Sequence, residues 1–126
     1  MTTTMRLNEI ENKRVGKEVA KMIRGLADKV KRVAEELPEE GQVAYGRVVD
    51  YLEEEYDDVR HKGIRIFSSY EDDMYKVASQ LEPGDWWPKR AQNKCRNCHA
   101  EMHRLIGMAR MYAIMVAEEK EDEIEY

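Results

Sequence analysis

The dominant pattern along this chain is a helical alternation of hydrophobic and polar positions. In the first third, apolar residues recur every three or four positions, which predicts one long helix from about Leu7 to Leu37, ended by Pro38. A second stripe predicts a helix from about Glu39 to Tyr56, in which the acidic run 53–55 is expected to face water.

The next part of the chain has a less regular pattern. Residues 57–67 include a glycine and β-branched residues, so we expect a loop, with a short extended piece as an alternative. Ser68 and Glu71 have the spacing of a capping box, which predicts a third helix that runs to about Leu81. Asp85 is then expected to cap the fourth helix.

The last helix has the most regular pattern. Its apolar positions step alternately by four and three, which is a heptad seam and predicts that both cysteines are buried. The chain is therefore expected to be a single all-α domain over residues 1–126, a four-helix bundle-like fold with a long basic N-terminal helix and a long C-terminal helix. The acidic tail 118–126 is expected to fray. The seam positions are Ala91, Cys95, Cys98, Met102, Leu105, Ala109, Tyr112 and Val116.

Composition adds a setting to this fold. Of the 126 residues, 37% are charged, whereas typical soluble domains have about 25%. A high charge content with few amide side chains is typical of thermophilic proteins, in which ion-pair networks are frequent. The chain begins without a signal-peptide pattern, and no apolar run approaches the roughly 20 residues of a membrane span. We therefore expect an intracellular or virion protein.

The net charge of −5 conceals an alternation of basic and acidic segments. Residues 1–34 carry a balance of +5, residues 35–82 of −9, residues 83–113 of +4, and residues 114–126 of −5. Because binding to a polyanion depends on where charge lies, the two basic segments are candidate phosphate-binding surfaces. A surface dense in ion pairs is the alternative. The candidate residues are Lys13, Arg14, Lys17, Lys21, Arg24, Lys31, Lys89, Arg90, Lys94 and Arg96.

Long basic helices in a small all-helical chain resemble the coat proteins of filamentous viruses of hyperthermophilic archaea, whose helices wrap double-stranded DNA. The resemblance is one of architecture and rests on no diagnostic motif. It implies a structural, self-assembling subunit whose partners are nucleic acid, duplex DNA in particular, and further copies of itself or a paralogous subunit. The overall acidity departs from a simple DNA-coating protein.

The segment from Lys94 to His103 holds both cysteines and two of the three histidines. Core packing of the cysteines is one interpretation, and a redox pair or a structural disulfide is another. Zinc is a third, with Cys95, Cys98, His99 and His103 as candidate ligands. One straight helix spreads these four side chains too widely to surround one ion, so His61, an acidic residue or another subunit would have to complete the site.

The same segment contains Cys95-Arg-Asn-Cys98-His99, which resembles the C-x-x-C-H attachment motif of c-type cytochromes. That resemblance implies thioether bonds from both cysteines to haem and His99 as an axial ligand. It covers five residues, and haem c attachment requires export.

Other motifs point away from catalysis. The chain has no glycine-rich phosphate loop, no nucleophile elbow and no Glu-x-x-His pair, so we expect no enzymatic activity. Trp86 and Trp87 are expected either to close one end of the bundle or to anchor a partner.

Overall fold

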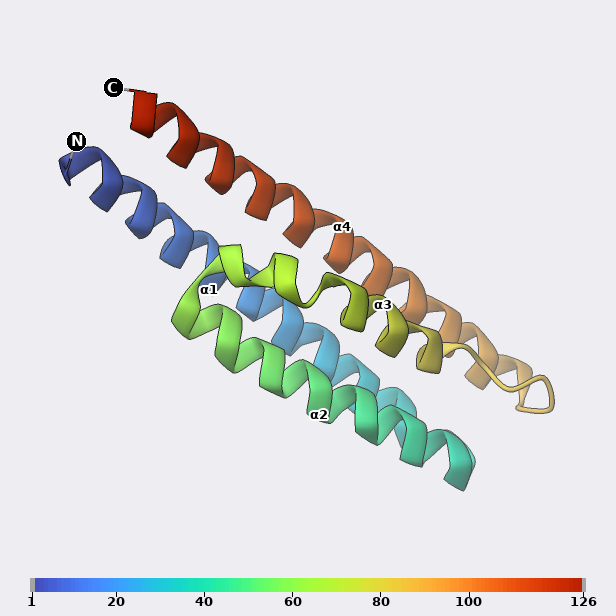
Figure 1. Ribbon diagram of the computed structural model, residues 1–126. Coiled ribbons are helices and arrows are strands. Elements are labelled where there is room, and N and C mark those ends of the chain that lie inside the picture. The colour runs from blue at the N-terminus through green and yellow to red at the C-terminus, as the bar shows by residue number, and fades with distance from the viewer. Residues whose placement is uncertain (1, 126) are drawn as a thin grey trace.

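The computed structural model describes the backbone of residues 2–125 and the side chains of residues 9–116, and this part of the chain contains helices and no strand. The prediction of an all-α fold with four main helices is confirmed (Figure 1). The elements in chain order are α1 (Thr2–Ala34), α2 (Glu39–Lys62), the 3₁₀-helix η1 (Ile64–Ser69), α3 (Glu71–Ala78), the 3₁₀-helix η2 (Ser79–Leu81) and α4 (Lys89–Glu125).

Helices α1 and α4 lie antiparallel, so both chain ends are at the same end of the molecule (Figure 1). An ion pair of 2.6 Å from Lys29 to Glu101 joins them. Helix α2 folds back along α1, where Lys31 lies 2.9 Å from Glu53. Helix α3 lies alongside α4, and the longer α4 extends beyond α3 toward the chain ends (Figure 1).

The core lies where these helices meet, and the seam of α4 is its best-predicted part. Cys95 and Cys98 are completely buried, as the heptad spacing predicts, and Met102 and Ala109 are buried beside them on the same face. Tyr112 is the exception, because it is 36% exposed at the edge of the α1–α4 groove and not in the core.

Helix α2 is longer than predicted. The stripe Tyr45, Val48 and Leu52 continues through Glu55 to Val59 at steps of three and four, so the buried face does not stop at residue 56. The last turn of α2 is basic and consists of Arg60, His61 and Lys62. Positive charge is stabilised there by the negative end of the helix dipole. The predicted loop at residues 57–62 is therefore wrong.

The predicted helix caps are also wrong. Ser68 lies inside η1, where its hydroxyl donates to Arg65 O at 3.0 Å, and α3 begins at Glu71 without a side-chain cap. Ile64 and Phe67 are buried, and three residues per turn place both on the core side of a 3₁₀-helix. Asp85 does not cap α4 either, because that helix begins at Lys89.

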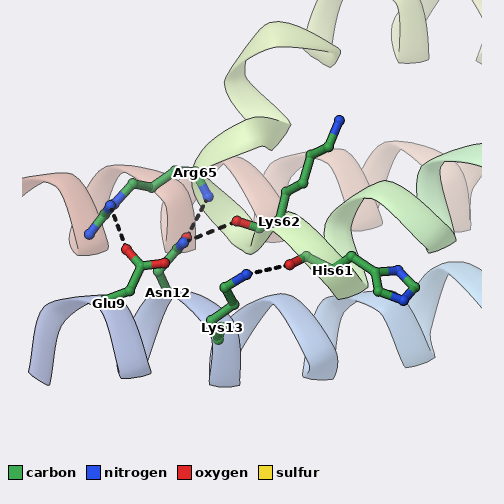
Figure 2. Close-up of polar contacts among 6 residues, drawn as sticks. All are labelled: Glu9, Asn12, Lys13, His61, Lys62 and Arg65. Carbon is green, nitrogen blue, oxygen red and sulfur yellow. Dashed lines mark hydrogen bonds and ion pairs between the residues drawn. The ribbon is translucent and has the colours of Figure 1, made fainter. Parts of the chain in front are cut away.

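The corner between α2 and η1 is held against α1 by polar side chains (Figure 2). The buried Asn12 amide donates to Lys62 O at 3.2 Å and accepts from Arg65 N at 2.9 Å. Glu9 pairs with the Arg65 guanidinium at 3.2 Å. These bonds fix the end of α2 on α1 and direct the chain back toward α4.

The two tryptophans before α4 have different environments. Trp87 is buried and donates through Nε1 to Glu40 at 3.3 Å, so it closes one end of the bundle. Trp86 is 67% exposed. The predicted fraying of the acidic tail concerns residues 118–126, whose side chains lie outside the described residues.

Candidate nucleic-acid interface and histidine pair

The six basic residues predicted on the first helix are all exposed on α1. Most of them lie along one stripe of α1, at steps of three and four residues that match the helical repeat. The stripe turns away from the buried positions Val19, Ile23 and Val30, since those residues occupy the opposite side of the helix. The predicted stripe residues are Lys13, Arg14, Lys17, Lys21, Arg24 and Lys31.

Several of these cations already have partners within the chain. Lys31 pairs with Glu53, whose carboxylate raises the pKa of Lys31, and Arg14 pairs with Glu11. Lys17 has no hydrogen bond or ion pair among the described residues. Exposed pairs of this kind contribute little to stability because water and salt screen them, so the cations could exchange a carboxylate for a phosphate at small cost.

The other three stripe residues make weaker or different contacts. Lys21 lies 3.9 Å from Glu18, and the Lys13 ammonium donates to the carbonyl of His61. The Arg24 guanidinium lies over the Tyr56 ring, 5.6 Å from its centroid. Lys13 and Arg24 therefore also hold α2 against α1.

Arg24 and Lys31 also line a groove between α1 and α2 of about 350 Å³. Acidic residues line it too, because Asp28, Glu53 and Asp57 lie beside the cations. On the side of the stripe next to α2, basic and acidic side chains therefore alternate, as in the ion-pair surface that was the alternative interpretation. The outer side, with Arg14, Lys17 and Lys21, is the part where cations predominate.

The four predicted cations of α4 lie at its start, at the opposite end of the molecule from the chain termini (Figure 1). Lys89 and Arg90 are exposed. Lys94 pairs with Glu36, and this contact lowers the pKa of Glu36. Arg96 donates to Gln92 and Asn93 on its own helix. The predicted residues thus form two groups. One is a stripe along α1, and the other lies at the start of α4. Arg32, on the last turn of α1, is exposed as well.

The predicted metal ligands are divided between two sides of α4. Cys95 and Cys98 lie in the core and are not joined to each other. Burial raises the pKa of Cys95 and raises that of Cys98 to about 11. The Tyr45 hydroxyl, which donates to Leu81 O at 2.8 Å, lies against Cys95. These surroundings favour neutral core thiols, because a metal ligand or a redox nucleophile needs the thiolate.

The two histidines of α4 face α3 at the surface. Their Nε2 atoms are 3.3 Å apart, and His99 Nε2 is 3.9 Å from Glu82 Oε1. The Tyr75 ring packs beside His103, with centroids 5.5 Å apart. Among the side chains of residues 9–116, no three His, Cys, Asp or Glu groups stand close enough together to hold a metal ion as they are placed.

His61 forms no group of three candidate ligands with this pair or with the cysteines among the described side chains. Tyr45, the α2 residue beside Cys95, precedes His61 by 16 positions on the same helix, a separation of about 24 Å at 1.5 Å per residue. His61 donates through Nδ1 to Asp57 O at 2.7 Å. The four candidate ligands and His61 therefore do not come together within one chain.

Sequence reasoning missed a buried acid. Glu55 is 3% exposed, although the run 53–55 was expected to face water. Burial, together with the nearby carboxylates of Asp58 and Asp73, raises its pKa to about 7. Neither Glu55 Oε2 nor the Tyr51 hydroxyl has a hydrogen-bond partner in the described part of the chain. The steps Leu52, Glu55 and Val59 were the signal, because they continue the apolar stripe.

No protein family model, no curated protein and no solved structure matches the chain. Among the described residues, none of the helices combines the length and the apolar character that a membrane crossing needs.

Proposed function

We propose that the chain is a structural, self-assembling subunit that coats nucleic acid, duplex DNA in particular, by binding the phosphate backbone without sequence preference. The observation that supports this most is the exposed cation stripe of α1, above all Arg14, Lys17 and Lys21. Lysine and arginine on a rigid helix can each replace a counterion at a phosphate, which gives affinity that depends on salt and little on sequence.

The dimensions of the stripe favour assembly. From Arg14 to Lys31 the helix rises about 26 Å, along which a duplex carries roughly 15 phosphates. One subunit therefore neutralises fewer than half of the charges that it covers. Several subunits side by side would bind more tightly, and the acidic segments could pair with basic faces of adjacent copies while the stripe of α1 faces the polyanion.

A titration against random duplex DNA and RNA at several salt concentrations tests the proposal. The double variant K17E/K21E should weaken binding to any duplex sequence. It should also flatten the slope of log affinity against log salt by about one to two units, because each lost phosphate contact removes roughly 0.9.

The matched control is R47E/K76E, which changes the net charge equally at exposed residues of α2 and α3 outside the stripe. It should leave the salt slope near that of the natural chain. Equal loss in both double variants would show a general charge effect, and no binding of the natural chain to either nucleic acid would rule the proposal out.

A second candidate function, zinc binding, is favoured by the geometry of the α4 histidines. Two nitrogens bound tetrahedrally to zinc at 2.0–2.1 Å are about 3.3–3.4 Å apart, and the two Nε2 atoms are 3.3 Å apart. Glu82 is exposed enough to turn toward them as a third ligand. An N–H of one ring that donates to the other ring explains the same distance without a metal.

Zinc titration of the purified full-length chain separates these explanations. His103→Ala should lower the zinc affinity at least about tenfold, since even residues that only support a ligand cost 10–100-fold. Cys95→Ala and the control His61→Ala should leave the affinity unchanged. Loss on removal of Cys95 with retention in His103→Ala would instead assign the metal to the core thiols.

A further inference from the structure

An exposed apolar stripe runs along the outer side of α4, beyond the core seam. Met111 is 64% exposed and Met115 is 52% exposed, and both lie in α4. Exposed apolar side chains that are grouped and rimmed by charge mark interaction sites, and methionine is frequent on such surfaces because it adapts its shape.

The apolar part of the stripe is formed by three methionines on one face of the helix. Met108, Met111 and Met115 step by three and four, Arg104 precedes them on the same face, and the backbone of α4 is helical throughout, to Glu125. Apolar positions spaced in this way on a face outside the core are typical of a helix that pairs with a second helix. In order, the outer-stripe positions are Arg104, Met108, Met111, Met115, Glu118, Asp122 and Glu125.

Charge along the outer stripe is asymmetric about its apolar centre. Arg104 precedes the methionines, whereas Glu118, Asp122 and Glu125 follow them. Two copies of such a stripe repel when they lie parallel, because acid meets acid. They attract when they lie antiparallel, because the basic end of each meets the acidic end of the other.

We infer that the outer stripe of α4 binds the same stripe of a second copy of the chain, antiparallel and about a twofold axis at Met111. In that register Arg104 of each copy stands opposite Glu118 of the other, and Met111 meets Met111. Gly107 stands opposite Met115 of the other copy, and a Cβ at Gly107 would have open space around it, so a methionine side chain has room there. Such a contact is isologous, the commonest kind in homodimers.

A nucleic acid is a poor occupant of the same stripe, because residues 114–126 carry a net charge of −5, which repels phosphates. The inference deepens the self-assembly part of the proposed function and rests on it for its purpose, whereas the contact itself needs no nucleic acid. The dimer is therefore tested in the absence of nucleic acid, so its failure and a failure of DNA binding are distinguishable.

The measurement is the mass of the full-length chain by sedimentation velocity at about 100 μM, a concentration that populates complexes of micromolar Kd. The natural chain should sediment as a dimer. Met111→Glu should sediment as a monomer, because it places two carboxylates together at the twofold axis. The matched control Val43→Glu adds the same charge at a 52% exposed valine of α2 and should stay dimeric.

A charge exchange tests the antiparallel register and does not depend on the fold of any one variant. Arg104→Glu alone should shift the equilibrium toward monomer, and the double variant R104E/E118R should restore the dimer. In a parallel pair the exchange would restore nothing, because each charge would still meet its own copy. A natural chain that stays monomeric, or a double variant no more dimeric than Arg104→Glu alone, would overturn the inference.

Discussion

The Asn12 side chain occupies the space that a side chain on Gly63 would need. A Cβ built on Gly63 would lie 2.5 Å from Asn12 Cγ. Gly63 also has a backbone φ of +95°, which residues other than glycine rarely adopt. The same amide bonds the backbone on both sides of Gly63 (Figure 2). One glycine and one asparagine thus decide how α2 ends and where η1 begins.

Gly63→Ala should lower the free energy of unfolding by about 2 kcal/mol or more, since positive φ alone costs roughly 1–2 kcal/mol and the Cβ also displaces Asn12. Chemical denaturation followed by circular dichroism measures the change. Gly46→Ala is the control, because its Cβ would meet nothing in the middle of α2. It should stabilise by about 0.5–1 kcal/mol, and an equal loss in both variants would contradict the account of Gly63.

Most of the fold could be predicted from the sequence, because helical periodicity is a local signal. The seam of α4 predicted the burial of Cys95 and Cys98 without reference to any other element. The path around Gly63 could not be predicted in this way. It depends on Asn12, 51 positions earlier, and no local pattern shows which asparagine will fill the space beside a given glycine.

The candidate site was predicted less completely, because charge spacing shows a face and not its partners. The exposure of Lys17 and Lys21 followed from the helical repeat. The contact of Lys94 with Glu36 joins residues 58 positions apart and depends on how α1 lies on α4. Glu55 was misplaced because a run of three glutamates indicates solvent, whereas the heptad step brings the third into the core.

The two adjacent tryptophans should differ strongly in their contribution to stability. Trp87 packs against Gly41, where a Cβ would lie 3.0 Å from the indole, and against Gly84. Trp87→Ala should therefore cost about 3–5 kcal/mol, whereas the exposed Trp86→Ala should change the free energy of unfolding by no more than about 0.5 kcal/mol. Thermal unfolding of both variants decides this, and similar losses would show that Trp86 also supports the fold.

The buried Glu55 should make stability depend on pH. Its folded pKa of about 7 lies above the ordinary value of 4.5, so the folded state binds this proton more tightly than the unfolded state. The stabilisation from protonation is present below pH 4.5 and is lost as the pH rises through 7. A shift of this size corresponds to about 3 kcal/mol.

Glu55→Gln, which stays neutral, should match the natural chain near pH 4.5 and should be more stable by up to about 3 kcal/mol at pH 8. Denaturant unfolding across this range measures the difference. Glu54→Gln removes the same charge from an exposed neighbour and should give a nearly constant difference. A Glu55 variant that tracks the natural chain at every pH would show that the acid is ionised without cost.

The two cysteines should be nearly inert in the folded chain. Both sulfurs are buried, and burial raises the pKa of the Cys98 thiol to about 11, so little thiolate forms at pH 8. A thiol reagent should then react slowly with native protein, at a rate set by opening of the α4 seam, and rapidly after denaturation. Val43→Cys provides the comparison, since a thiol on the exposed side of α2 should react at once and show that the reagent is active. Rapid labelling of Cys95 and Cys98 in the native state would overturn the seam assignment. It would also return both thiols to the candidates for metal or redox chemistry, because only an accessible thiolate can do either.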